Sequence, residues 1–264
     1  MKKAVMPIGI VKEKEMVTVQ QGRDIRSCSV EVDTKSKGET RFMKRNVDMR
    51  EISDGKLYGL NDMVKADCGD CKGCSACCRG MGSSIVLDPL DLYRLETGLH
   101  TDFQRLMNGY IELNVVDGII LPNLKMGGSD ESCAFLSQEG RCQVHAVRPG
   151  ICRLFPLGRI YKEEGRGFDY FLQVHECKKE NRSKVKVRKW IDTPDVKQYE
   201  QFIIDWHYFL EDVTAQVKNI SDEAKVKEKI MYLLTVFYVQ PYDGAKDFYT
   251  QFYERLEAAK TIFG

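Results

Sequence analysis

The chain has 264 residues, of which 43% are apolar and 10% aromatic, so it can build a sizeable core without metal ions throughout. Forty basic residues balance thirty-nine acidic ones, and the resulting formal charge of +1 excludes a global attraction to nucleic acid or to an acidic membrane. No apolar run approaches the roughly 20 residues that span a bilayer, and charged residues 12–15 interrupt the N-terminal segment before a signal-peptide core forms. We therefore expect a soluble, cytoplasmic protein.

The expected organisation has three parts. An N-terminal segment, residues 1–66, contains short strands and loops, and a cysteine-cluster metal-binding domain follows over residues 67–180. A basic linker, residues 178–189, leads to a helical C-terminal region over residues 190–264. The predicted fold class is α+β, with a cysteine-rich body of short helices and β-hairpins and a helical C-terminal layer.

Two short helices are predicted after the first cysteines. Asp88 and Pro89 are typical of an N-cap followed by proline at the first helical position, and this helix should end at Gly98. Thr101 is predicted to cap the second helix, residues 101–110.

Three β-hairpins are predicted farther along. The Asp-Gly pair at 117–118 lies between two β-rich runs, which is a strong hairpin signal. A second hairpin should turn at 139–140. A third should turn at 165–167 and carry Cys177 at the end of its last strand.

The C-terminal region predicts three helices, over residues 194–219, 221–240 and 246–263. One face of the first helix carries apolar residues at spacings of three and four, which is typical of a core-facing stripe rather than a cofactor site. These residues are Tyr199, Phe202, Ile203, Trp206, Phe209, Leu210 and Val213.

The ten cysteines could form five disulfides, but disulfide-dense chains are usually small and secreted. Closely spaced cysteines in a reducing compartment indicate metal or redox chemistry instead. Residues 68–78 hold five cysteines, and a spacing of two intervening residues lets both sulfurs reach one metal. Soft thiolates favour Zn(II), Cu(I) or an iron–sulfur cluster over Mg or Ca.

The vicinal pair Cys77-Cys78 departs from the ferredoxin run, which also has a proline after its last cysteine. Adjacent side chains diverge, so either one of the two is a supporting or redox thiol, or two centres lie close together. A second block of cysteines brings the expected ligands to eight, enough for two four-coordinate sites or one cluster with spare thiols. The expected metal ligands are Cys71, Cys74, Cys77, Cys78, Cys133, Cys142, Cys152 and Cys177.

Converging thiolates accumulate negative charge, about −2 for a four-thiolate iron–sulfur cubane. Arginines beside the cysteines in sequence could offset this charge or could form ordinary surface ion pairs. They are Arg79, Arg141, Arg148, Arg153 and Arg159.

Several ordered motifs between residues 68 and 177 resemble the bacterial and archaeal CxxCxxCC cysteine-cluster family, of the YkgJ type. They are Cys71-x2-Cys74-x2-Cys77-Cys78, Cys133-Ala-Phe-Leu, Gly140-Arg-Cys142 and Arg148-Pro149-Gly-Ile-Cys152-Arg153-Leu-Phe155-Pro156. The resemblance implies a zinc- or iron-chelating domain bound through cysteines. The family also includes flagellin lysine N-methylases, so a particular activity is not implied.

The roles of several other residues have more than one interpretation. Cys68 continues the three-residue spacing and is either a ligand or a spare or redox thiol. His145 and His175 suit zinc but are more typical of half-buried strand histidines. Cys28 is expected to be a small buried or half-exposed residue. The basic linker has no nucleic-acid-binding motif beside it, so we expect no nucleic-acid partner.

We therefore expect a metal-binding protein that serves electron transfer, metal handling or the core of an enzyme. The sequence tilts toward an iron–sulfur cluster of the 4Fe-4S type, with zinc as the alternative. Two other functions stay open: a lysine N-methylase-like modifying enzyme, by analogy alone, and a structural zinc domain whose C-terminal helices bind a protein partner. No catalytic residues are legible, because nucleophile-elbow, phosphate-loop and dinucleotide motifs are missing from the sequence.

Overall fold

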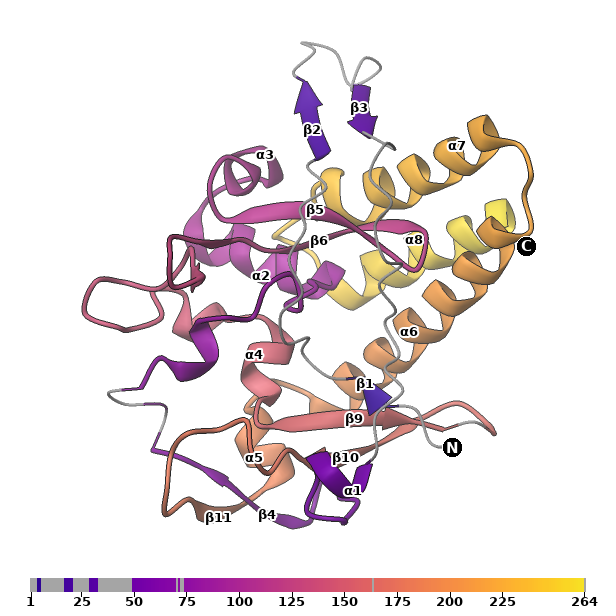
Figure 1. Cartoon of the computed structure of the whole chain (residues 1–264). Coiled ribbons are helices and arrows are strands. Elements are labelled where there is room, and N and C mark those ends of the chain that lie inside the picture. Colours follow the sequence, from indigo (N-terminus) through magenta and orange to yellow (C-terminus); the bar gives the residue numbers. More distant parts are fainter. Residues whose placement is uncertain are drawn as a thin grey trace.

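The computed structural model describes residues 4–5, 17–20, 29–32, 49–69, 71, 74–162 and 164–263. It is a mixed α+β structure, as predicted (Figure 1). The helices are α1 Met49–Ile52, α2 Pro89–Leu99, α3 Phe103–Met107, α4 Gly150–Leu154, α5 Val187–Ile191, α6 Val196–Lys218, α7 Glu223–Leu234 and α8 Phe248–Phe263. Three further helical turns are η2 Ala76–Cys78, η3 His145–Val147 and the π-helical η4 Thr235–Val239. Cys28 lies outside the described residues.

The strands form small antiparallel sheets rather than one large one. They are β1 Ala4–Val5, β2 Val17–Gln20, β3 Ser29–Val32, β4 Met63–Asp67, β5 Ile111–Val116, β6 Ile119–Leu124, β7 Met126–Gly127, β8 Ser132–Cys133, β9 Leu157–Tyr161, β10 Phe168–Leu172 and β11 Ser183–Lys186. One sheet has three strands in the order β1-β9-β10, and the other strands pair as β4-β11, β2-β3, β5-β6 and β7-β8.

The prediction of a basic linker over residues 178–189 is wrong for residues 183–189. Residues 183–186 form β11, which pairs with β4, and α5 follows directly. The reason is local: Val185 is half-buried, and Val187, two residues on, is fully buried in the core. Two apolar side chains two residues apart anchor one face of this segment despite its positive charge.

The two helices after the first cysteines form where expected, with one correction. Asp88 caps α2: its Oδ1 accepts a hydrogen bond from the Asp91 amide at 2.8 Å, and the Asp88 amide donates back to the Asp91 carboxylate. The second helix is shorter than predicted, and its cap is Asp102 rather than Thr101. The carboxylate of Asp102 accepts from the Arg105 amide at 2.9 Å, because it lies three residues before that donor.

The first and third predicted hairpins are confirmed. Asp117 and Gly118 both have positive φ angles, 54° and 89°, as a type I′ turn between β5 and β6 requires. Strand β10 pairs with β9 but ends at Leu172, so Cys177 does not lie on it, contrary to the prediction. The Gln173 amide still donates to the Pro156 carbonyl at 3.0 Å, but Pro156 has no N–H to donate in return, so the ladder stops there.

The second predicted hairpin is only a tight turn. The Ser137 amide donates to the Arg141 carbonyl at 2.9 Å, and a single bridge joins Leu136 and Cys142. The following residues form η3 instead of a strand. His145 therefore lies in a helical turn, whereas the sequence predicts that it lies on a strand.

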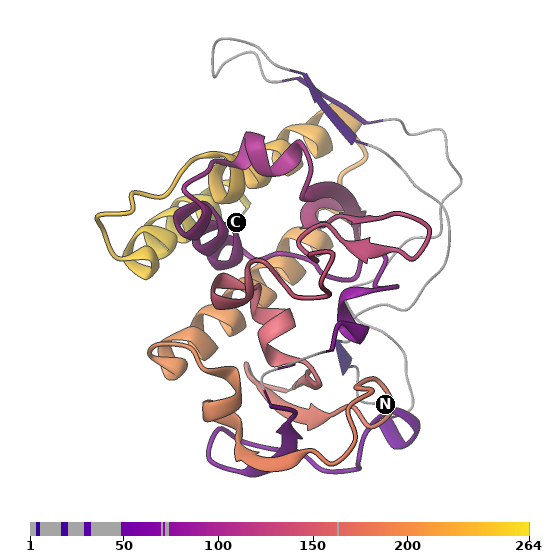
Figure 2. The same ribbon diagram turned by 90° about the vertical axis from the view of Figure 1, so that its left-hand side faces the viewer.

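Three C-terminal helices cover the body, as expected, and Figures 1 and 2 show them grouped along one side of the molecule. Every residue of the predicted apolar stripe on α6 is buried. The core that they join is continuous, from Val64 on β4 to Phe263 at the end of α8. No helix among the described residues is long and apolar enough to cross a membrane.

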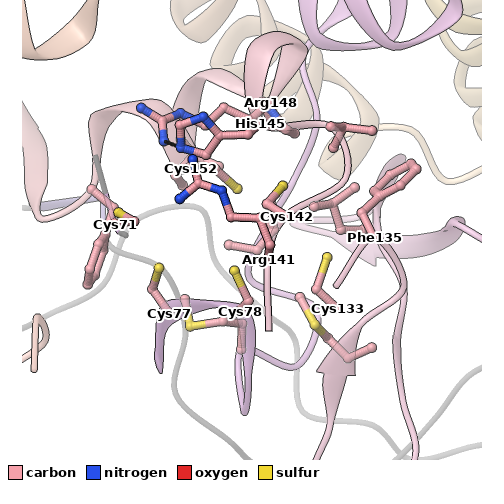
Figure 3. A pocket seen from close by; sticks show the side chains of 18 of the residues that line it. Cys71, Cys77, Cys78, Cys133, Phe135, Arg141, Cys142, His145, Arg148 and Cys152 are labelled. Carbon is pink, nitrogen blue, oxygen red and sulfur yellow. Dashed lines mark hydrogen bonds between the residues drawn. The ribbon is translucent and has the colours of Figure 1, made fainter. Parts of the chain in front are cut away.

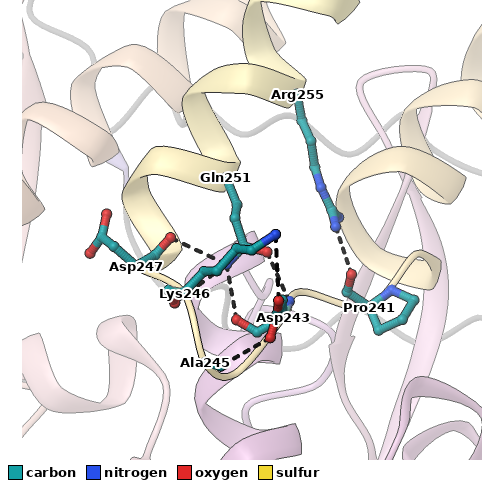
Figure 4. A network of polar contacts seen from close by, with 7 residues as sticks. All are labelled: Pro241, Asp243, Ala245, Lys246, Asp247, Gln251 and Arg255. Carbon is teal, nitrogen blue, oxygen red and sulfur yellow. Dashed lines mark hydrogen bonds and ion pairs between the residues drawn. The ribbon is translucent and has the colours of Figure 1, made fainter.

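The loop before α8 is fixed by polar contacts (Figure 4). The guanidinium of Arg255 donates to the Gln240 and Pro241 carbonyls at 2.8 and 2.7 Å and lies 3.7 Å from the ring centroid of Tyr242. The Gln251 side chain accepts from the Asp243 amide at 2.8 Å and donates to its carbonyl. Backbone groups with no helical partner are thereby satisfied from the next helix.

Candidate metal centre

Seven of the eight cysteines predicted as ligands line one cavity of about 60 Å³ (Figure 3). They come from three places: the loop up to η2, the end of β8 with the turn after it, and α4. The seven are Cys71, Cys74, Cys77, Cys78, Cys133, Cys142 and Cys152. The eighth, Cys177, lines a smaller neighbouring pocket together with Cys68.

Backbone contacts bring the two cysteine blocks together. The Gly80 amide, just after η2, donates to the Glu131 carbonyl at 3.0 Å. Arg79 forms a bridge with Ser132 on β8, and its side chain donates to the Ser132 hydroxyl at 2.6 Å and pairs with Asp130. These contacts hold Cys78 and Cys133 on adjoining walls of the cavity.

Helix α4, which carries Cys152, is fixed by a buried carboxylate. The Gly150 amide at its start donates to Oδ1 of Asp91 at 2.7 Å. A side chain is not tolerated at Gly150, because a Cβ there would lie 2.3 Å from the hydroxyl of Tyr199. Asp91 is thus a positioning residue for the site. Sequence reasoning missed Asp91, because its partner Gly150 lies 59 residues away along the chain.

Among the residues that the structure describes, the lining of the cavity has thiols and an imidazole as donors and no carboxylate. Between the cysteines the walls are apolar, with Met81, Ile85, Leu124, Met126, Phe135, Val144, Pro149, Ile151 and Phe155. Sequence reasoning missed these apolar walls, which lower the local dielectric and strengthen every electrostatic interaction in the site. None of these lining residues offers a side-chain oxygen to a hard cation such as Mg²⁺.

Two of the five predicted arginines line the cavity, namely Arg141 and Arg148. Arg148 hydrogen-bonds to Nε2 of His145, and because a guanidinium has no acceptor, the imidazole accepts through that nitrogen. The other arginines have structural partners. Arg153 donates to the carbonyls of Asp192 and Ala146, and Arg159 donates to the hydroxyl of Tyr199 at 3.0 Å.

The vicinal pair differs in acidity. A hydrogen bond from Cys77, helped by the charges of Arg79 and Arg148, lowers the pKa of Cys78 to about 7. Donating that hydrogen bond, together with burial, raises the pKa of Cys77 far above its ordinary value. Cys78 is therefore the thiol that ionises most easily in the metal-free cavity.

Four thiols of the cavity influence one another directly. Burial is the main cause that raises the pKa of Cys133, Cys142 and Cys152, to about 11 for Cys133, and each is raised further by the charge of Cys78. Cys133 and Cys142 also act on Cys152. In Figure 3 these four side chains face one another across the cavity. We call Cys78, Cys133, Cys142 and Cys152 the inner quartet.

Cys71 and its neighbours Cys68 and Cys74 form a second group. Burial and the neighbouring Cys68 raise the pKa of Cys71 to about 12, with a smaller contribution from Cys74. Across the described residues, no three His, Cys, Asp or Glu side chains already converge on one point as ligands of a single ion. The sulfurs of the seven-cysteine cavity line its walls, an arrangement that leaves space between them.

Residues 70–188 match the model of the CxxCxxCC family, described as a "putative zinc- or iron-chelating domain". This segment is similar to that family, and we call residues 70–188 the CxxCxxCC domain. It covers somewhat less than half of the chain and includes all seven cysteines of the cavity, Cys177 and strand β11. Cys68 lies just outside the CxxCxxCC domain. Neither the curated proteins nor the solved structures gave a significant match.

Proposed function

We propose that the CxxCxxCC domain holds an iron–sulfur cluster of the 4Fe-4S type on the inner quartet and serves one-electron transfer. The observation that carries the proposal is the lining of the cavity: seven thiols, apolar walls, two arginines and, in the described part of the chain, no carboxylate. Cysteine thiolates are the usual ligands of such clusters, and four of them complete one cubane. When bound, the cluster would supply a reversible one-electron couple.

The size of the cavity supports a multi-atom occupant. Its volume of about 60 Å³ is several times the ~10–15 Å³ that one water-sized sphere requires. The inner quartet supplies four ligands, and a four-thiolate cubane carries a charge of about −2. Arg141 and Arg148 on the cavity wall offset this charge.

The apolar surroundings would also affect the reduction potential of a bound cluster. The potential of a cluster depends on its net charge, on hydrogen bonds to its sulfurs and on its exposure to solvent. Cys133 is buried, whereas Cys78, Cys142 and Cys152 are half-buried. A cluster on these thiols would lie near the surface at one edge, where electrons enter or leave.

The test is anaerobic purification of the full chain, followed by iron and acid-labile sulfide analysis and by electron paramagnetic resonance before and after reduction. We expect iron and sulfide in equal amounts and a signal that reduction switches reversibly. Cys133→Ala and Cys142→Ala should lose both, whereas Cys28→Ala, a cysteine outside both blocks, should retain them. A fully folded protein that contains zinc but neither iron nor sulfide would overturn the proposal and leave a structural zinc site as the better reading.

A further inference from the structure

We propose that the chain has a second metal site, made by Cys68, Cys71, Cys74 and Cys177, for a single thiolate-bound ion such as Zn²⁺. We call these four cysteines the outer quartet. The proposal does not depend on the iron–sulfur cluster, because none of its four thiols belongs to the inner quartet, although Cys71 and Cys74 line both pockets. It also reaches beyond the CxxCxxCC domain, because Cys68 precedes the matched segment.

The pocket that the outer quartet lines is suited to one ion. All four cysteines line it, and three cysteines that line it, Cys71, Cys74 and Cys77, also line the seven-cysteine cavity. Its volume is about 10 Å³, close to the ~10–15 Å³ of one water-sized sphere. A multinuclear cluster therefore fits the larger cavity, and a single ion fits this one.

Two of the sulfurs are already at the spacing of metal ligands. The Sγ atoms of Cys68 and Cys71 are 3.6 Å apart. Two thiolates bound at ≈ 2.3 Å to one tetrahedral zinc lie roughly 3.8 Å apart, whereas disulfide sulfurs are separated by about 2.05 Å. The intervening turn contains Gly69 with a φ angle of +66°, and the Cys74 amide donates to the Cys71 carbonyl at 3.0 Å, which brings Cys74 back toward the pair.

Sheet pairing explains how Cys177 reaches this loop. Asp67, the last residue of β4, pairs with Ser183 of β11, and the Ser183 hydroxyl donates to the Asp67 carboxylate at 2.9 Å. Cys68 directly follows Asp67, and Cys177 lies six residues before Ser183. The pocket therefore forms where the chain enters β11 beside the end of β4.

The charged residues of the pocket and the positions of its sulfurs also suit a bound ion. Lys178, Lys179 and Glu176 line the pocket, and the two lysines outnumber the glutamate, so they would offset part of the negative charge of four thiolates around a divalent ion. Since the four sulfurs do not yet converge on one point, binding would draw Cys74 and Cys177 toward the Cys68–Cys71 pair. The ion would then tie the cysteine loop to the segment that leads into β11.

The test is an anaerobic titration of the reduced, metal-free full chain with Co²⁺, whose visible d–d bands report tetrahedral thiolate coordination. Cys68→Ser and Cys177→Ser should each lose one tightly bound equivalent of Co²⁺ and keep the iron content of the purified protein. Cys133→Ser is the matched control: it should lose the iron and keep that Co²⁺ equivalent. If the cluster proposal fails, the parent contains no iron for Cys133→Ser to lose, and the result for Cys68 is unaffected.

Two outcomes would overturn the second site. One is that the parent chain and both serine variants bind the same number of Co²⁺ equivalents with the same spectrum, while circular dichroism shows all of them folded. The other is that mass spectrometry finds a Cys68–Cys71 disulfide in protein purified without oxygen. That result would identify the pair as a redox couple rather than as ligands.

Discussion

At the scale of single residues, the buried carboxylates at the start of α2 have a pH-dependent effect. Burial, and to a smaller degree the neighbouring Asp91, raises the pKa of Asp88 from 3.8 to about 8. The unfolded carboxyl ionises near its ordinary value, so between these pH values the folded chain binds the additional proton. This contribution to stability is complete below about pH 4 and is lost as the pH rises through 8.

Asp88→Asn tests this coupling, because asparagine caps helices as well as aspartate does and has no proton to lose. We expect the stability of the variant, relative to that of the parent, to rise with pH by up to about 1.4 kcal/mol per pH unit. Urea unfolding of both proteins across this pH range measures it. Asp222→Asn, at the exposed cap of α7, is the control and should follow the parent. Parallel curves for Asp88→Asn and the parent would contradict the assignment.

At the scale of elements, the β5–β6 hairpin depends on a left-handed turn. Gly118 has a φ angle of +89°, where a side chain is strained, so Gly118→Ala should destabilise the chain by about 1–2 kcal/mol. Gly109→Ala is the matched control, because its Cβ would meet nothing within 4 Å and its φ angle is not in the left-handed region. Thermal unfolding should separate the two variants, and equal melting temperatures would show that the turn tolerates alanine.

In the helical layer, the side chain of Arg255 connects several backbone segments. Besides the contacts in Figure 4, its guanidinium donates to the Val236 carbonyl at 2.7 Å, so it joins α8 to the π-helical end of α7. Arg255→Ala should lower the free energy of unfolding by about 1–3 kcal/mol, since it leaves carbonyls without their donor. Lys260→Ala, on the same helix, removes only an exposed pair with Glu257 and should cost at most about 1 kcal/mol. Denaturant unfolding measures both variants, and equal losses in the free energy of unfolding would exclude this role of Arg255.

The elements that could be predicted from the sequence are those with local causes. The cap at Asp88, the turn at Asp117-Gly118 and the apolar stripe of α6 each depend on residues within a few positions. The errors have non-local causes. Strand β10 ends because Pro156, on the partner strand, lacks an amide hydrogen, and β11 forms because β4 is beside it.

At the scale of the whole molecule, the cysteine spacing predicts convergence of the two blocks but not how the thiols divide. Nothing in the spacing separates Cys177 from Cys152, yet the two line different pockets. The division follows from which strands lie side by side, β8 beside the end of η2 and β11 beside β4. Whether these cysteines bind metal stays a prediction, which the pH dependence of metal affinity tests.

Metal binding by the inner quartet should release protons and strengthen as the pH rises. The thiolate is the ligand, and three of the four thiols have raised pKa values, those of Cys133, Cys142 and Cys152. With Zn²⁺ as the probe and Cys68→Ser to remove the outer site, the logarithm of the apparent affinity should rise by roughly three per pH unit above pH 7. The slope should steepen below pH 7, where Cys78, with its pKa of about 7, also holds a proton. Competition with a chromophoric chelator at several pH values measures the slope, and a slope below about one would mean that these thiols are not the ligands.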